Sequence, residues 1–483
     1  MVDVPARTGL LIDGVVEHRD RTLAVHEPWT GAHLSDQAIA DPEDVDRAVA
    51  AGHRVLRTPL PLHERAAILD RTADLVLRDA EHLAGLIALE AAKPMLAARA
   101  EVQRCVQTLR FSAVEARTLH DRTVPLDAHP VGVGAIGFVR REPIGVVAAI
   151  TPFNFPLNLT AHKLGPAIAA GCPVVCKPAE RTPLSAVALA ERFVEAGLPP
   201  GWLAVLTGGG PEVGGVLARH PGVAAVSFTG SAAVGAILSR DAAHAEVLLE
   251  LGSAAPLVVE ADADLVEVVA AAVAGGFTHA GQSCVSVQRL LFHETIAEDV
   301  TQRLTERVAA LRVGGPLEPG SDLSCVIDAT AGDRIRSWVA RTVDAGGRLL
   351  VGGGGSGAVV EPTLVTDVPL DAPLWTDEVF GPVIAIRTFG STDEAIAAVD
   401  AGPPLIHIGV FTRDLALAGR WIGAVRAGGV LINESPTFRV DHAPYGGVDH
   451  PGTTREGPAS TVRALTDEKL VVIRPSAGRA DPW

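Results

Sequence analysis

Short apolar runs alternate with segments of helical periodicity through the middle of this 483-residue chain. The apolar runs, bounded by Gly and Pro, predict buried strands at 145–150, 173–176, 202–206 and 223–228. Helices are predicted between them, at 159–170, at 183–196 and after Gly230. Strands that alternate with helices form a parallel sheet, because each helix returns the chain across one face of the sheet. The pattern therefore predicts an α/β fold.

A second alternation begins at the apolar run 256–259 and continues through a helix at 265–280, a strand at 289–293 and a helix at 297–311. Before the first alternation, helical periodicity at 41–56, 63–80 and 91–119 predicts a largely helical N-terminal section. A Pro- and Gly-rich stretch at 125–134 precedes a strand-like run at 135–141, and an isolated β run lies at 469–473. We therefore predict two α/β units and separate β segments.

Charge and cysteine usage limit the possible partners. The formal net charge of −16 argues against nonspecific binding to nucleic acid or anionic membranes. The five cysteines show no paired framework, which is typical of a reducing compartment. Cys172 and Cys176 lack nearby His or Cys partners in sequence, so we expect no metal site. Residues 1–20 have no apolar signal core, and the run 268–277 is too short to span a bilayer. We expect a cytoplasmic protein with no membrane partner.

Two short motifs carry candidate chemistry. Cys284 ends a run of small and polar residues, 281–284, that follows an apolar helix. A thiolate on such a turn is open to close approach by an electrophile. Glu250 precedes Leu251 and Gly252 on a separate segment, where a carboxylate suits the activation of water against a thioester. Either motif alone is a weak signal, since a lone Cys is usually a small buried side chain.

Further motifs stand at 151–156 (Thr-Pro-Phe-Asn-Phe-Pro), 177–180 (Lys-Pro-Ala-Glu), 228–231 (Phe-Thr-Gly-Ser) and 378–382 (Glu-Val-Phe-Gly-Pro). In this order, the set resembles the aldehyde dehydrogenase superfamily from Gly14 to Val472. The resemblance implies a Rossmann-type cofactor domain (1–118 and 142–250), an α/β catalytic domain (251–448) and a small β oligomerisation arm (119–141 and 462–483). It also implies a homodimer or homotetramer. The pattern is closest to hydrolytic members acting on lactaldehyde, phosphonoacetaldehyde or, without phosphorylation, glyceraldehyde 3-phosphate.

The resemblance implies a role for each of three residues. Cys284 attacks the aldehyde carbon, Asn154 and the backbone N–H of Cys284 stabilise the oxyanion, and Glu250 activates the water that releases the acid. Relatives that pass the acyl group to coenzyme A generally lack this carboxylate, so hydrolysis is favoured. Two alternatives stay open: a coenzyme-A-acylating semialdehyde dehydrogenase, and a catalytically retired scaffold with a binding role.

A nicotinamide cofactor is implied, and the residues indicate NAD rather than NADP. Lys177 and Glu180 follow a predicted strand, where open α/β sheets bind ligands, and Glu180 would repel a 2′-phosphate. Gly230 and Ser231 stand where a strand meets a helix N-terminus, which suits a phosphate. The resemblance adds Thr151, Pro152, Phe153, Gly210, Val234, Leu251, Glu378 and Phe380. Ala232 and Ser253 depart from the residues usual in the family.

The substrate is expected to be a small polar or anionic aldehyde. Asn158 and His162 lie on the helix after Asn154, where relatives acting on apolar aldehydes carry large apolar residues. Arginine is a good partner for an anionic group, although a structural ion pair is the simpler interpretation of each single arginine. The candidate substrate residues are Phe155, Asn158, His162, Arg110, Ser283, Arg439 and His442, and Arg289 is a further candidate for an anion.

Overall fold

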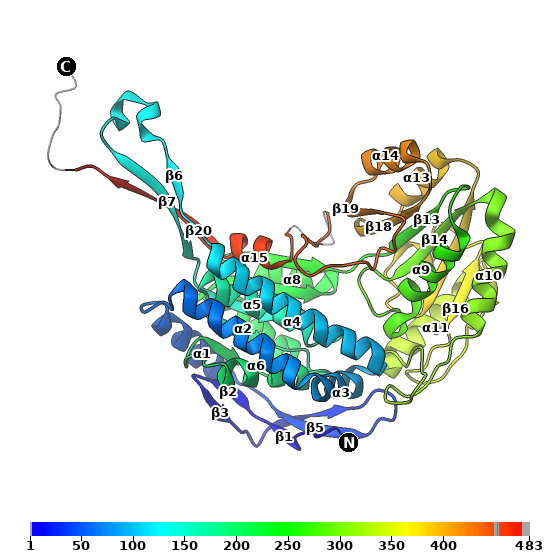
Figure 1. Ribbon diagram of the computed structural model, residues 1–483. Coiled ribbons are helices and arrows are strands. Elements are labelled where there is room, and N and C mark those ends of the chain that lie inside the picture. The colour runs from blue at the N-terminus through cyan, green and yellow to red at the C-terminus, as the bar shows by residue number, and fades with distance from the viewer. Residues whose placement is uncertain (1, 449–451, 453, 476–483) are drawn as a thin grey trace.

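The computed structural model describes residues 2–448, 452 and 454–475. Figure 1 shows two lobes and a projecting arm. Each lobe is built on a seven-stranded sheet, and two three-stranded sheets complete the described strands. Residues 476–483, which were assigned to the arm, lie outside the described residues. Among those described, no helix is both long and apolar enough to cross a membrane.

The first sheet has the order β12-β11-β8-β9-β10-β2-β3. Its five parallel strands are β8 (Val146–Ile150), β9 (Val174–Lys177), β10 (Leu203–Val205), β11 (Val223–Gly230) and β12 (Glu246–Leu251). The chain runs from β8 through β9 to β10 in one direction, then crosses back to β11 and β12 on the other side of β8. The carboxyl ends of β8 and β11 therefore form a topological switch point, where α/β sheets bind ligands.

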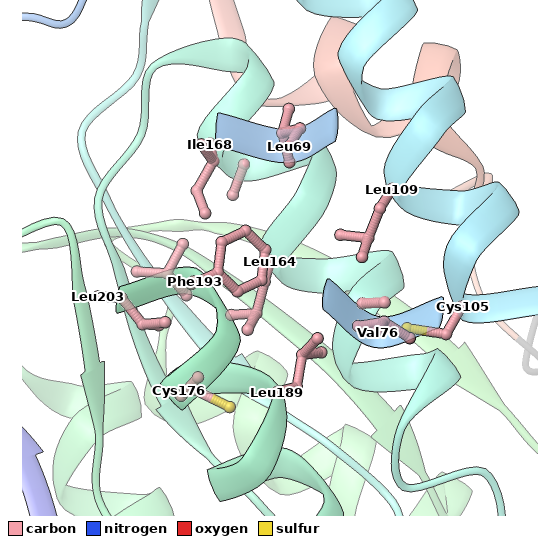
Figure 2. Close-up of a cluster of buried hydrophobic side chains, with 14 of the residues drawn as sticks. Leu69, Val76, Cys105, Leu109, Leu164, Ile168, Cys176, Leu189, Phe193 and Leu203 are labelled. Atoms are coloured by element: carbon pink, nitrogen blue, oxygen red, sulfur yellow. The ribbon is translucent and has the colours of Figure 1, made fainter. Parts of the chain in front are cut away.

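Alternate residues of these strands enter two separate cores. Val147, Ala149 and Cys176 pack against helices on one face, whereas Val146, Ala148 and Val175 pack on the other. Figure 2 shows the first core, where side chains of α2, α4, α5 and α6 meet strand residues such as Leu203. The helices of this lobe are α1 (Pro42–Val55), α2 (Leu62–Arg78), α3 (Ala80–Ala91), α4 (Met95–Thr118), α5 (Asn158–Ala170), α6 (Leu184–Glu195), α7 (Gly215–Arg219) and α8 (Ala232–Asp241).

The second sheet has the order β15-β16-β17-β14-β13-β18-β19. Its strands are β13 (Ala255–Val259), β14 (Val287–His293), β15 (Arg348–Val351), β16 (Thr363–Thr366), β17 (Val383–Phe389), β18 (Leu405–Phe411) and β19 (Ala427–Ile432). Its helices are α9 (Leu265–Phe277), α10 (Ala297–Ala309), α11 (Ala329–Asp344), α12 (Pro373–Thr376), α13 (Thr392–Asp400) and α14 (Leu415–Ala424). All strands except β15 pair in parallel, which confirms the predicted α/β class.

The arm joins distant parts of the chain. Strand β20 (Thr466–Ile473) pairs antiparallel with β7 (Ile136–Pro143), and β7 pairs with β6 (Arg122–Val124). This sheet projects from the first lobe, and α15 (Pro458–Ala464) precedes β20 (Figure 1). Ile136 of β7 and Leu470 of β20 are exposed on this sheet.

The helices predicted at 41–56, 63–80 and 91–119 are present as α1, α2 and α4, but no strands were predicted for residues 7–38. This part forms β1 (Arg7–Thr8), β2 (Leu10–Ile12), β3 (Val15–Glu17), β4 (Thr22–His26) and β5 (His33–Ala38). These strands are too short for a clear period, and pairing defines them: Leu11 of β2 lies opposite Val205 of β10. Helix α3 is also separate from its neighbours, because Ala92 adopts φ 49° and Pro94 then begins α4.

Candidate active site

The two lobes meet where the loop after β8 approaches the loop after α9. The side-chain amide of Asn154 donates a hydrogen bond of 3.0 Å to the backbone carbonyl of Gln282. Residues His279, Ala280 and Gly281 all have φ between 52° and 68°, so the chain turns sharply after α9. A side chain at Gly281 would lie 2.1 Å from the carbonyl oxygen of Gly381, so only glycine fits. This turn brings Cys284 close to Asn154.

Cys284 is half-buried and is held on two sides. The Ser253 hydroxyl donates to its backbone carbonyl at 2.7 Å, and its Sγ lies 2.6 Å from the Tyr445 hydroxyl. Burial raises the pKa of the Cys284 thiol to about 12, although the Tyr445 hydrogen bond and Arg439 oppose this rise. The other four cysteines are fully buried. Cys284 is therefore the one thiol of the chain with access to a ligand.

Glu250 lies near the end of β12, beside Thr229 of β11. Its side chain is buried, and neither carboxylate oxygen has a hydrogen-bond partner among the described residues. Burial and the nearby Glu456 carboxylate raise its pKa, while Lys163, Arg439 and Arg455 lower it to a smaller extent. Glu250, Ser227, Thr454 and Glu456 line a hollow with room on the scale of one water molecule. An unpartnered carboxylate facing such a hollow is suited to accept a proton from water.

The switch point of the first sheet has features that fit a dinucleotide. Ser231 caps the N-terminus of α8, and a side chain at Gly230 would lie 2.4 Å from the Phe228 ring. The buried Thr229 hydroxyl has no partner within the described residues. Lys177, whose side chain is almost fully buried, reaches the half-exposed Glu180 carboxylate at 3.1 Å. Burial would raise the pKa of Glu180, but Lys177, a backbone hydrogen bond and Arg181 together keep this pKa below its usual value, so the carboxylate is charged.

The remaining candidate cofactor residues lie at both ends of this region. The Phe153 and Phe380 rings meet edge to face at 5.7 Å between centroids. The Glu378 carboxylate lies against Gly252 and accepts a hydrogen bond of 3.2 Å from the backbone N–H of Ser253. Burial raises the pKa of Glu378 to about 7. The amide of Thr151 donates to the carbonyl of Lys177, Pro152 is half-buried and Leu251 packs against Gly235. Gly210 begins the turn after β10, and Val234 is exposed on α8.

A buried polar network connects α5 to the late loop, residues 435–445. Asp441 accepts hydrogen bonds from Asn158 (3.1 Å), His162 (2.9 Å) and Arg104 (2.8 Å). Burial alone would raise the pKa of Asp441, but His162 and Arg104 lower it well below its usual value. Asn158 and His162 are almost completely buried, so they hold the late loop in place. They do not form an open wall in this arrangement.

Arg439 also belongs to this network. Its guanidinium pairs with Glu456 at 2.6 Å, lies 3.3 Å from His162 and covers the Tyr445 ring at 3.9 Å from its centroid. Asp441, which is close to Arg439 in sequence, pairs instead with Arg104. Burial opposes the charge, but Glu456 and Tyr445 raise the pKa of Arg439 above its usual value.

The other candidate substrate residues do not all gather here. Arg110 lies on the exposed side of α4, paired with Asp74 at 3.4 Å, away from the late loop. Arg289 lies on β14, is fully buried and donates a hydrogen bond to the backbone carbonyl of Ala254, so it has no contact with solvent. The Arg104 guanidinium lies over the Phe155 ring, with its Cζ atom 5.6 Å from the ring centroid. The His442 ring packs against Phe111. Ser283 is half-buried beside Cys284.

The family model described as the aldehyde dehydrogenase family matches residues 15–471. The chain belongs to this family. A 3-sulfolactaldehyde dehydrogenase from Priestia aryabhattai is 38% identical over 96% of this chain and 98% of the relative. A lactaldehyde dehydrogenase from Methanocaldococcus jannaschii is 34% identical over 96% of this chain and 100% of the relative. The crystal structure of the glyceraldehyde-3-phosphate dehydrogenase GapN from M. jannaschii, complexed with NADP, has a TM-score of 0.91 at 33% identity, covering 95% of this chain and 100% of GapN.

Sequence reasoning missed several residues that this aldehyde dehydrogenase brings to the site. Tyr445 and Arg104 were not among the candidates predicted from the sequence. Glu456 and Lys163 lie 3.8 Å apart beside Glu250. Buried charge is rare, so a lysine in the middle of the apolar α5 was the one available signal. Within the described part of the chain, no group of three or more His, Cys, Asp or Glu side chains is arranged to hold a metal.

Proposed function

We propose that this aldehyde dehydrogenase oxidises a small 2-hydroxyaldehyde, polar or anionic at its far end, to the carboxylic acid with NAD. The observation that carries the proposal is the convergence of Cys284, Asn154 and Glu250. The nucleophile and the oxyanion donor are joined through the Asn154–Gln282 hydrogen bond, and the Glu250 carboxylate is close enough to raise the pKa of the Cys284 thiol. The reaction needs these three groups in separate roles.

In the first half-reaction, the Cys284 sulfur attacks the aldehyde carbon. The oxygen of the adduct becomes an alkoxide, which the Asn154 amide and the backbone N–H of Cys284 stabilise. A bound nicotinamide would supply the acceptor for the hydride that leaves the same carbon. Burial excludes bulk water, so each donor acts in a medium of low dielectric constant. The product of this half-reaction is a thioester on Cys284.

In the second half-reaction, Glu250 takes a proton from water and the resulting hydroxide attacks the thioester. The raised pKa of Glu250 makes it a stronger base than an exposed carboxylate. Lys163 and Glu456 lie beside Glu250. Lys163 stabilises the ionised carboxylate, whereas Glu456 favours the protonated form. The C–S bond then breaks, the acid leaves, and Cys284 is regenerated as its thiolate.

The cofactor assignment rests on Glu180. Its carboxylate is charged and half-exposed, so it would hydrogen-bond a ribose hydroxyl and repel a 2′-phosphate. The helix N-terminus at Ser231 suits the pyrophosphate, and Glu378 and Phe380 would contact the nicotinamide end. The NADP complex of GapN makes NADP the competing cofactor, so the two must be compared directly.

The substrate class rests on the two arginines of the late-loop network. Arg104 pairs with Asp441 and Arg439 pairs with Glu456, and Lys163 lies 3.8 Å from Glu456. Arg104 is the more accessible arginine, with 28% of its side chain exposed. The names of the similar proteins support the class, since sulfolactaldehyde, lactaldehyde and glyceraldehyde 3-phosphate are all three-carbon 2-hydroxyaldehydes.

We also propose a homodimer or homotetramer in the cytoplasm. The arm leaves Ile136, Leu470 and Val472 more than half exposed, which suits contact with a second subunit. All five cysteines are free thiols, as expected in a reducing compartment. The expected division into domains, 1–118 with 142–250 and 251–448, follows the strands of the two large sheets and remains a proposal.

The test is a panel of short aldehydes, neutral and anionic, followed by NADH absorbance. Wild-type protein should form NADH without coenzyme A, because Glu250 supplies hydrolysis. Cys284→Ala should abolish turnover and retain NAD binding in calorimetry. Turnover by Cys284→Ala would refute the assigned nucleophile, and a strict requirement for coenzyme A would favour the acylating alternative.

A further inference from the structure

Tyr445 is the single tyrosine of the chain, and its hydroxyl lies 2.6 Å from the Sγ atom of Cys284. The ring is almost fully buried, with 4% of the residue exposed. The two residues are 161 positions apart in sequence, so the fold of the late loop brings the Tyr445 hydroxyl into contact with the Cys284 sulfur. A phenylalanine would fill the same volume, and the hydroxyl is therefore the part that needs an explanation.

The position of the hydroxyl is held from several directions. Tyr445 exchanges two backbone hydrogen bonds with Glu456, of 2.9 and 2.6 Å. Its ring meets His407 edge to face at 5.1 Å, and the Arg439 guanidinium covers the ring at 3.9 Å. Val285 and Ile406 complete the apolar packing around it. The hydroxyl consequently cannot move away from Cys284 without disturbing the late loop.

The protonation states decide which group donates. Burial raises the pKa of Tyr445 well above its ordinary value, so the phenol keeps its proton at any working pH. A thiolate carries no hydrogen, and it can only accept. The charged groups facing the sulfur are Glu378 and Glu250, which raise the pKa of the Cys284 thiol, and Arg439, which lowers it. Of the side chains around the sulfur, Tyr445 is the one hydrogen-bonded to it in the described structure.

We propose that Tyr445 is a further catalytic residue, whose hydroxyl donates a hydrogen bond to the Cys284 thiolate and so increases the ionised fraction of the nucleophile. When the thiol ionises, its proton passes to solvent and the phenol keeps its own. When the sulfur then bonds to carbon, it becomes a poorer acceptor, so the hydroxyl is released toward the substrate. The proposal rests on the proposed function in one respect, that Cys284 is the nucleophile.

The test is Tyr445→Phe, which removes one oxygen and keeps the ring, its packing on His407 and its contact with Arg439. The rate of alkylation by iodoacetamide is measured against pH, with Cys284→Ala as the background, because the other four cysteines are buried. A hydrogen bond to a charged group is lost, so the apparent pKa of alkylation should rise by about one to two units. Below that pKa, labelling should slow by about ten- to a hundredfold.

Ser253→Ala is the matched control. It removes a hydroxyl that bonds the backbone carbonyl of Cys284 and does not touch the sulfur. Its alkylation pKa should stay near that of the wild type. An unchanged pKa in Tyr445→Phe, or an equal rise in Ser253→Ala, would overturn the proposal, since the second result would assign the effect to loop position. Melting temperatures of both variants identify any unfolded sample. Alkylation of Tyr445→Phe is then repeated at a lower temperature at which the variant is folded, and an alkylation pKa equal to that of the wild type at that temperature would count against the proposal.

Steady-state and burst kinetics separate this proposal from the proposed function. Tyr445→Phe should slow the NADH burst by about the same factor as the labelling, with little change in the affinity for NAD. If Cys284→Ala retains turnover, the proposed function fails even though the labelling result stands. If Cys284→Ala is inactive and Tyr445→Phe labels and turns over like the wild type, the role of Tyr445 fails alone.

Discussion

Lys93 donates a hydrogen bond of 2.6 Å from its Nζ atom to the backbone carbonyl of Asn154. Lys93 also forms a fully buried ion pair with Glu101, whose other oxygen accepts the backbone N–H groups of Leu157 and Asn158. The pair thus holds both ends of the loop that carries the candidate oxyanion donor. Lys93 precedes α4 and Glu101 lies within it, so the helix fixes the distance between the two contacts.

Breaking this pair should cost both stability and turnover. Lys93→Met leaves Glu101 buried without its cation, and such changes typically cost about 3–5 kcal/mol. We expect a lower free energy of unfolding in urea and a fall in kcat, because the carbonyl of Asn154 loses its partner. KM for the aldehyde should change less than kcat. Lys469→Met, which removes an exposed lysine from the arm, is the control and should change neither quantity. An unaltered kcat in folded Lys93→Met would show that the loop is held by other contacts.

Glu250→Gln should accumulate the acyl-enzyme. The amide cannot take a proton from water, and loss of a general base typically slows a step by about 10²–10⁴-fold. We expect a burst of NADH followed by slow turnover, with the acyl adduct on Cys284 detected by intact mass. A steady-state rate equal to that of the wild type would place the base elsewhere.

The pH dependence of deacylation should follow the raised pKa of Glu250. Its base form exists only above that pKa, so the deacylation rate should rise with pH through it. Glu456→Gln removes the like charge and frees Lys163 and Arg439 to act on Glu250 alone, and both effects lower the pKa of Glu250. The acid limb of the profile should therefore move to lower pH. A limb that stays in place, or moves upward, would contradict the coupling between the two carboxylates.

The choice between NAD and NADP should depend on Glu180. Wild-type protein should have the higher kcat/KM with NAD, and Glu180→Gln should improve the NADP value by about tenfold, which corresponds to ~1.4 kcal/mol of repulsion removed. Glu212→Gln removes another exposed carboxylate, from the turn after β10, and should leave the ratio unchanged. A wild-type preference for NADP would refute the assigned role of Glu180.

Recognition of an anionic aldehyde should depend on the arginines of the late-loop network. A charge-assisted hydrogen bond contributes about 1.5–3 kcal/mol, so Arg439→Ala or Arg104→Ala should lose about ten- to a hundredfold in kcat/KM on an anionic aldehyde. A neutral aldehyde of similar length should be affected little. Arg110→Ala, which breaks only an exposed pair, is the matched control. Because Arg439 also pairs with Glu456, equal losses on both aldehydes with a lower melting temperature would assign it a structural role.

Much of the fold was predictable, because hydrophobic periodicity records which faces are buried. Strands β8, β9 and β11 and helices α5 and α6 lie within a few residues of the predicted ranges. The short strands β1–β5 were missed, since three apolar residues such as 10–12 carry no period until they pair with β10. The position of the candidate cofactor loops in the fold was also predictable, because parallel strands bring their carboxyl ends to one edge of the sheet.

The sequence by itself determined the α/β class and the family, and it named Cys284, Asn154 and Glu250 as candidates, because motifs and the periodicity of buried residues can be read along the chain. Only the tertiary structure decided which arginines lie in the late-loop network and which hydroxyl group contacts the Cys284 sulfur. Arg439 and Arg110 are both single arginines in sequence, yet the first is buried against Glu456 and the second is exposed on α4. Tyr445 acquires its contact with Cys284 only when the late loop folds onto the second lobe. Such contacts depend on distances between segments far apart in the chain, and no local pattern specifies those distances.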